Sequence, residues 1–157
     1  MKSSVTLIAL ALLGTSFYLH ADGELELEQC PQVVQDTIRA NARDGDIDDV
    51  NSITLEGRTL YLVAVDLPHK KDLKLFLWSD GKLIKTQEEM TVDETPSSVV
   101  DAALKLVPKG GKLDDIDKEV AEGKVTYLVE IDRPEGPDLN LVLGEDGTLI
   151  SQTEGRD

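Results

Sequence analysis

The chain has few of the side chains that most enzyme and metal sites use. Its 157 residues include one cysteine, two histidines and one tryptophan, and aromatic residues make up only 4%. A single cysteine cannot form an internal disulfide. A Cys-His pair or a histidine-based metal site would have to use Cys30 and His69. A pair of catalytic carboxylates stays open because acids are numerous, but the rarity of aromatics argues against a sugar-binding cleft. We therefore expect no enzymatic activity, no metal site and no cofactor.

Basic residues are also scarce. The chain has 16 lysines and arginines against 31 aspartates and glutamates, a formal net charge of −15. Sequence-independent nucleic-acid binding and adsorption to anionic lipid both depend on an excess of basic side chains. The composition therefore disfavours these two classes of partner, so we expect no nucleic-acid partner, and it leaves a cationic partner, or simple solubility, open.

Only one long apolar run is present, and it lies at the N-terminus. Lys2 precedes an almost wholly apolar stretch over residues 5–13, which polar residues follow. This stretch is about half of the roughly 20 residues that a membrane-spanning helix needs, and Ala21 suits signal peptidase. We expect residues 1–21 to be a signal peptide and the protein to be periplasmic or secreted, without membrane attachment after cleavage. An uncleaved anchor is the alternative. Cleavage would remove Lys2 and no acid, which changes the formal charge from −15 to −16.

The rest of the chain contains two similar segments. The segment Gly57–Pro68 aligns with Gly123–Pro134 at an offset of 66, and the same offset relates Asp80–Gly81 to Asp146–Gly147. Upstream the offset is 65, because the second segment has an extra residue in its Gly110–Gly111 turn. Such self-similarity is typical of repeated structural units. We therefore predict two repeats, over residues 22–91 and 92–157.

Each repeat has the pattern of a helix followed by four strands. Pro31 and Pro96 suit the first turn of a helix, and apolar residues recur every four positions after them. Gly45 and Gly110 suit helix ends with positive φ, and the two Asp-Gly pairs favour tight hairpins. The sequence predicts an α+β fold: two tandem helix-plus-four-antiparallel-strand repeats, with the helices packed on one face of the sheet.

Alternation within the strands predicts which side chains meet the helices. We expect Tyr61, Val63 and Val65 to face them, as do Tyr127, Val129 and Ile131 in the second repeat. On the opposite face the first repeat places Leu62, Phe76 and Trp78, where the second has Leu128, Val142 and Gly144. An exposed apolar patch that includes tryptophan is typical of a protein interface. We predict partner binding by Leu62, Phe76 and Trp78. The alternative is that residues 25–27, or the other repeat, cover them.

The proline-started helix, the Gly-led hairpin into Tyr-x-Val-x-Val/Ile, and the Asp-Gly hairpin followed by Leu-Ile resemble the PepSY-like domains, which are grouped with the β-lactamase inhibitor protein fold. These motifs lie in Gly57–Ile84 and Gly123–Ile150, and the likeness covers almost all of the chain after residue 21. The resemblance implies a curved sheet with helices on one side, export, and a role in binding or restraining other proteins, including peptidases. It brings no catalytic residue, and no segment matches an inhibitory loop residue by residue.

Four acids, Asp44, Asp46, Asp48 and Asp49, offer a second interpretation. Their alternate spacing resembles part of a calcium loop, but the sixth position of that loop is Asp49 instead of glycine and the twelfth is Leu55 instead of glutamate. A solvated turn fits these residues better. The sequence therefore favours an exported, non-enzymatic module that binds an unidentified protein, such as an enzyme it regulates. The alternative is a small-ligand or calcium-binding protein of the cell envelope.

Overall fold

The structure is a computed structural model that describes residues 21–55 and 57–155. The predicted signal peptide lies outside the described residues except for Ala21. Nine strands and two α-helices account for most of the described chain, and a short 3-10 turn precedes each helix. The strands are β1 (Ala21–Leu25), β2 (Asp46–Leu55), β3 (Arg58–Leu67), β4 (Lys71–Trp78), β5 (Leu83–Glu89), β6 (Lys112–Ala121), β7 (Lys124–Asp132), β8 (Leu139–Gly144) and β9 (Leu149–Glu154). The helical segments are η1 (Leu27–Gln29), α1 (Gln32–Asn41), η2 (Val92–Glu94) and α2 (Ser97–Leu104).

All nine strands form one antiparallel sheet in which each strand pairs with its neighbours in sequence, from β1 to β9. The middle of this sheet is the pairing of β5 with β6, which runs from Lys85 opposite Ala121 to Glu89 opposite Asp117. The predicted pair of tandem helix-plus-four-strand repeats is therefore wrong as a description of the fold. Strands from both predicted repeats form a single sheet, and β1, which precedes α1, was not predicted. The broader α+β class is confirmed. The predicted boundary at residue 91 lies between β5 and η2.

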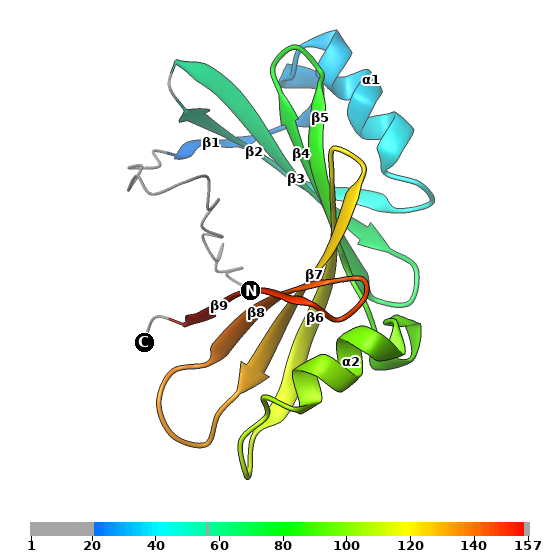
Figure 1. The fold of residues 1–157 in the computed structure, drawn as a ribbon. Helices are drawn as coiled ribbons and strands as arrows, with labels where there is room; N and C mark the ends of the chain where they lie inside the picture. Colours follow the sequence, from blue (N-terminus) through cyan, green and yellow to red (C-terminus); the bar gives the residue numbers. More distant parts are fainter. Residues whose placement is uncertain (1–20, 56, 156–157) are drawn as a thin grey trace.

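Both helices lie on the same side of the curved sheet (Figure 1), and each covers its own core. In the first core, Val34 and Ile38 of α1 pack with Tyr61, Val63 and Val65. The second core combines two residues of α2 with the alternate side chains of β7 and β8: Val99, Ala103, Tyr127, Val129, Ile131, Leu139, Leu141 and Leu143. These assignments confirm the predicted helix-facing columns. Burial of these side chains is the main source of stability in each core, at about 1.5–3 kcal/mol per large apolar side chain.

The turns agree with the sequence in part. Gly81 and Gly147 have positive φ, and Asp80 and Asp146 each accept a hydrogen bond from the backbone two residues later. At the end of α1, however, the left-handed residue is Arg43 (φ 56°) and not Gly45. Gly45 has a different requirement, because a Cβ there would lie 2.8 Å from the Asp66 carbonyl oxygen and 2.6 Å from a Val65 methyl group. A side chain at this position cannot fit without movement of β3.

Candidate protein-binding face

The side of the sheet that faces away from α1 and α2 is called the open face here. Figure 1 shows that both edge strands curve away from the helices, so the open face is the concave side of the sheet. Strand alternation places Leu62 and Phe76 on it as directly opposite residues of β3 and β4, and Leu60 and Trp78 as the next such pair. The three residues predicted to bind a partner are therefore brought together on this face.

Two apolar residues of the open face are buried although they point away from both helices. Leu60 is 2% exposed and Phe76 is 5% exposed, whereas Leu62 and Trp78 are half-buried. Cations cover the aromatic rings: the Lys85 ammonium lies 4.5 Å from the Phe76 ring centre, and the Arg58 guanidinium lies 4.0 Å from that of Trp78. Cation–π contacts of this kind contribute about 0.5–2 kcal/mol. Leu62 and Trp78 are thus the part of this patch that a partner can reach, whereas Phe76 is buried beside them.

Lys85 also joins the two halves of the sheet. Its side chain is only 9% exposed, and its ammonium lies 2.6 Å from the Glu119 carboxylate on β6. Removing one partner from such a buried pair leaves an uncompensated charge, whereas replacing both with apolar groups is often harmless. The pair therefore links β5 to β6 at the centre of the open face.

A second polar contact crosses the same pair of strands. Gln87 on β5 donates a hydrogen bond from Nε2 to Asp117 Oδ2 on β6, at 2.5 Å. Gln87 is 3% exposed, and its Oε1 is buried and accepts no hydrogen bond within the described part of the chain. Burial raises the pKa of Asp117 above its ordinary value, against the opposing effect of the Gln87 hydrogen bond.

Negative charge gathers at one end of the open face, toward the start of β2 and the end of β3. We call this the acidic end and define it by five residues: Asp66, Asp72, Asp115, Asp117 and Glu130. Asp66 lies opposite Asp72, and Asp115 lies opposite Glu130. Desolvation and neighbouring carboxylates raise the pKa values of Asp66 and Glu130.

The far half of the open face is apolar again but smaller. Leu128 of β7 lies opposite Val142 of β8, and Thr126 lies opposite Gly144, so no aromatic side chain occurs at these positions. The open face therefore has an aromatic patch on β3 and β4, a charged centre on β5 and β6, and a modest aliphatic patch on β7 and β8.

The segment proposed to cover the aromatic patch lies elsewhere. Leu25 and Leu27 pack against the first core, on the helix side of the sheet. Hence the alternative in which residues 25–27 cover Leu62, Phe76 and Trp78 is wrong. Sequence reasoning missed Lys85, Gln87, Asp117 and Glu119. These four residues occupy alternate positions on two polar strands. With the β5–β6 pairing known, that pattern would have predicted polar contacts between the two strands.

The other candidate residues do not assemble into a site. Cys30 is buried in the first core, and burial, with Glu28 nearby, raises the pKa of its thiol, which disfavours the reactive thiolate. His69 is exposed in the turn between β3 and β4. Within residues 21–55 and 57–155, no three histidine, cysteine, aspartate or glutamate side chains are grouped so as to hold a metal ion, and this includes Asp44, Asp46, Asp48 and Asp49. Nor does any helix in those residues have the length and apolar character to cross a bilayer.

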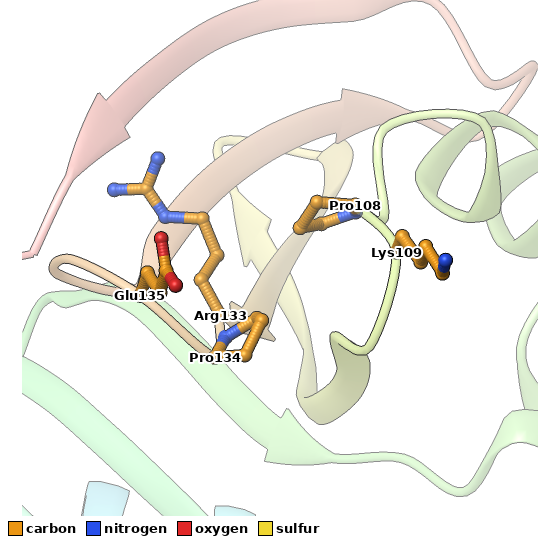
Figure 2. A pocket seen from close by; sticks show the side chains of 5 residues that line it. All are labelled: Pro108, Lys109, Arg133, Pro134 and Glu135. Carbon is orange, nitrogen blue, oxygen red and sulfur yellow. The ribbon is translucent and has the colours of Figure 1, made fainter.

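A pocket is present away from the open-face patches, between the loop before β6 and the loop after β7 (Figure 2). Five residues line it: Pro108, Lys109, Arg133, Pro134 and Glu135. Arg133 is already engaged, since it donates to the Pro137 carbonyl and pairs with Glu154 at 3.0 Å. Figure 2 shows the Lys109 ammonium directed away from the other four side chains. The charged groups do not converge, so we do not consider this pocket the functional site.

A strongly curved antiparallel sheet with two helices on its convex side defines a known structural class. The fold is similar to that of a BLIP-like protein from Bacteroides fragilis, with a TM-score of 0.63 and 16% identity over 82% of this chain and 90% of that one. A DUF2874 family protein from Bacteroides uniformis matches with a TM-score of 0.64 and 18% identity over 80% of this chain and 89% of the other. A proposed periplasmic protein from Bacteroides eggerthii matches with a TM-score of 0.66 and 15% identity, covering 80% and 88% of the two chains. No family model and no curated protein matches the sequence. These likenesses establish a BLIP-like fold.

Proposed function

We propose that the protein is an exported, non-enzymatic module that binds another protein on its open face. Leu62 and Trp78 would make the apolar contacts, and Phe76 would hold them in place. Regulation of a peptidase or another enzyme is the form of binding that the PepSY-like motifs imply. The periplasmic assignment of one structural neighbour and the short N-terminal apolar run both support export.

The observation that carries the proposal is the aromatic patch on the side of the sheet that carries no helix. Trp78 and Leu62 are half-buried there, and neither belongs to either of the two cores. Tryptophan is enriched among the residues that dominate binding energy, and such residues are usually surrounded by polar groups that exclude water. Arg58, Lys85 and Glu119 provide that kind of surrounding.

The alternative of a calcium-binding protein has less support. Its proposed ligands lie in the turn before β2 and along that strand, and no group of three or more acids suited to a metal ion occurs in the described part of the chain. A thermal shift with and without calcium tests it directly, because any ligand of the native state must raise stability by mass action.

The proposed function is tested with Trp78→Ala. A partner is first isolated from the exported fraction with the immobilised protein and then purified. Its affinity for wild type and variant is measured by calorimetry, beside the free energy of unfolding of each. We expect binding to weaken by about 2 kcal/mol or more, with stability changed by about 1 kcal/mol or less.

Val33→Ala is the matched control, because Val33 is an apolar side chain of α1 that is 47% exposed on the opposite side of the sheet. It should leave the affinity unchanged. If folded Trp78→Ala and Val33→Ala bind alike, the aromatic patch is not the binding surface. If Trp78→Ala unfolds the protein and the fluorescence of Trp78 in the free protein is that of a buried indole, Trp78 is a structural residue and the patch is again not the binding surface.

A further inference from the structure

Two independent features meet at the acidic end of the open face. The first is an excess of negative charge: among the described residues, none of the five acids that define this end forms an ion pair with a lysine or arginine. The second is Gln87, whose buried Oε1 lacks a hydrogen-bond partner while its Nε2 is bonded to Asp117. A buried acceptor without a partner costs about 1–3 kcal/mol in a folded protein, so native structures rarely retain one without a reason.

The chemistry of these groups specifies what would satisfy them. Asp117 supplies a carboxylate and Gln87 supplies a neighbouring carbonyl oxygen, so both require a donor and the carboxylate also favours a positive charge. An ammonium group concentrates its charge at one point. A guanidinium is planar and carries five N–H donors in a fixed fork, which lets it bind two adjacent acceptors at once.

Lys74 lies next to these acceptors. It lies directly opposite Gln87 in the pairing of β4 with β5, it is half-buried, and its charge acts on Asp117. Gln87 Oε1 is buried in the free protein, and we infer that the Lys74 side chain moves when a ligand binds. Exchange of the Lys74 ammonium for an incoming guanidinium would leave the net charge of the acidic end unchanged, so the displacement has a small electrostatic cost.

We propose that the acidic end of the open face is a subsite for an arginine side chain of the protein partner, with the guanidinium held between the Asp117 carboxylate and Gln87 Oε1. This inference deepens the proposed function and rests on it for the identity of the occupant. The partner would then be a protein with an exposed apolar group that contacts Trp78 and Leu62. It would also carry an exposed arginine, separated from that group by about one strand spacing or more. The acidic composition of the chain then attracts the partner, and the subsite aligns it.

The test uses a defined probe and does not need the partner. Acetyl-Gly-Arg-Gly-amide is titrated into the protein at about 0.15 M salt, where the field of scattered surface charges is largely screened. Binding is followed by NMR through the side-chain amide signals of Gln87. The uncharged citrulline peptide and the lysine peptide serve as ligand controls. We expect saturable shifts with a dissociation constant in the millimolar range for the arginine peptide, weaker binding of lysine and none of citrulline.

Three variants separate the subsite from general attraction. Asp117→Asn keeps the shape and the acceptor for Gln87 but removes the charge, and should weaken binding at least about fivefold. Lys74→Ala removes the competing cation and should strengthen it by a similar factor. Glu145→Gln removes the same charge from the exposed β8–β9 turn and should have little effect. Equal weakening by Asp117→Asn and Glu145→Gln, equal affinity for lysine and arginine, or no saturation up to about 20 mM would overturn the subsite.

Failure of the arginine subsite and failure of the proposed function give different results. The peptide assay does not involve Trp78, and Trp78→Ala should leave it unchanged. If the peptide binds as expected but Trp78→Ala retains full affinity for the purified partner, the arginine subsite stands and the aromatic contact fails. If the partner depends on Trp78 but the peptide does not bind, only the subsite is wrong.

Discussion

Replacing Glu119 with glutamine should test the charged centre of the open face most severely. Lys85 would remain buried, with a side chain only 9% exposed, but would lose the carboxylate that lies 2.6 Å from its ammonium. Leaving one member of a fully buried ion pair alone costs about 3–5 kcal/mol. Glu119 is itself 19% exposed, and the Phe76 ring still contacts the ammonium, so we expect a smaller loss of about 2 kcal/mol for Glu119→Gln.

Removing the lysine in place of the glutamate should cost less stability. Methionine at position 85 has a length similar to lysine and can still lie over Phe76, while the Glu119 carboxylate left behind has more access to water. We expect Lys85→Met to cost about 1 kcal/mol or less, and the double variant to be close to wild type, since a pair of this kind is often replaced by neutral groups without loss. The double-mutant cycle should then give a coupling energy of about 2–3 kcal/mol.

The assay is equilibrium unfolding in urea at pH 7, followed by circular dichroism and by the fluorescence of the single tryptophan, Trp78. Coincident transitions from the two signals would show that unfolding is cooperative across the sheet. The opposite results would be that Lys85→Met is the more damaging change, or that the coupling energy is close to zero. Either result would mean that the Lys85–Glu119 ion pair is not what stabilises the centre of the face.

Three further predictions follow from the same structure. The pKa of Asp117 is raised in the folded state, so the stability that the protonated carboxyl contributes is present below the unfolded-state pKa and is lost as the pH rises through the folded-state pKa. Asparagine mimics the neutral carboxyl, so Asp117→Asn should raise the melting temperature at pH 7 relative to wild type, and the difference should be smaller at pH 3. An unchanged difference across this range would contradict the assignment. Hydrogen bonds from Lys71 and Thr91 lower the pKa of Glu94 to about 2, and carboxyl NMR should show this value return toward normal in Lys71→Ala. Finally, Val63→Asp, which places a carboxylate at a 1% exposed position of the first core, should cost several kcal/mol and prevent folding, whereas Leu62→Asp on the open face should leave a folded protein by circular dichroism.

The sequence predicted those parts of the fold that depend on local chemistry. Alternation identified Val63 and Val129 as core residues because one face of each strand is buried, and the Asp-Gly pairs identified two hairpins because these residues tolerate the required backbone angles. Proline marked both helix starts within one residue.

What the sequence did not predict depends on contacts between distant segments. The pairing of β5 with β6 is made largely by polar residues, from Lys85 to Glu89 on one strand, and such a stretch has no hydrophobic pattern that predicts its partner. The single sheet was missed for this reason, and so were the Lys85–Glu119 and Gln87–Asp117 contacts across it. Phe76 was predicted to contact a partner, but it is buried because Lys85 of the neighbouring strand β5 lies over its ring.

Site-specific photo-crosslinking in the exported fraction of the source cells can show whether a protein partner binds the open face. p-Benzoylphenylalanine is introduced in place of Leu62 or Trp78 on the open face, and in place of Val33 or Leu104 on the exposed surfaces of α1 and α2. Circular dichroism confirms that each variant is folded before illumination. We expect positions 62 and 78 to crosslink to the same protein and positions 33 and 104 not to crosslink to it. Crosslinks to one defined protein from the helix positions alone, or equally from all four, would show that the open face is not the binding surface.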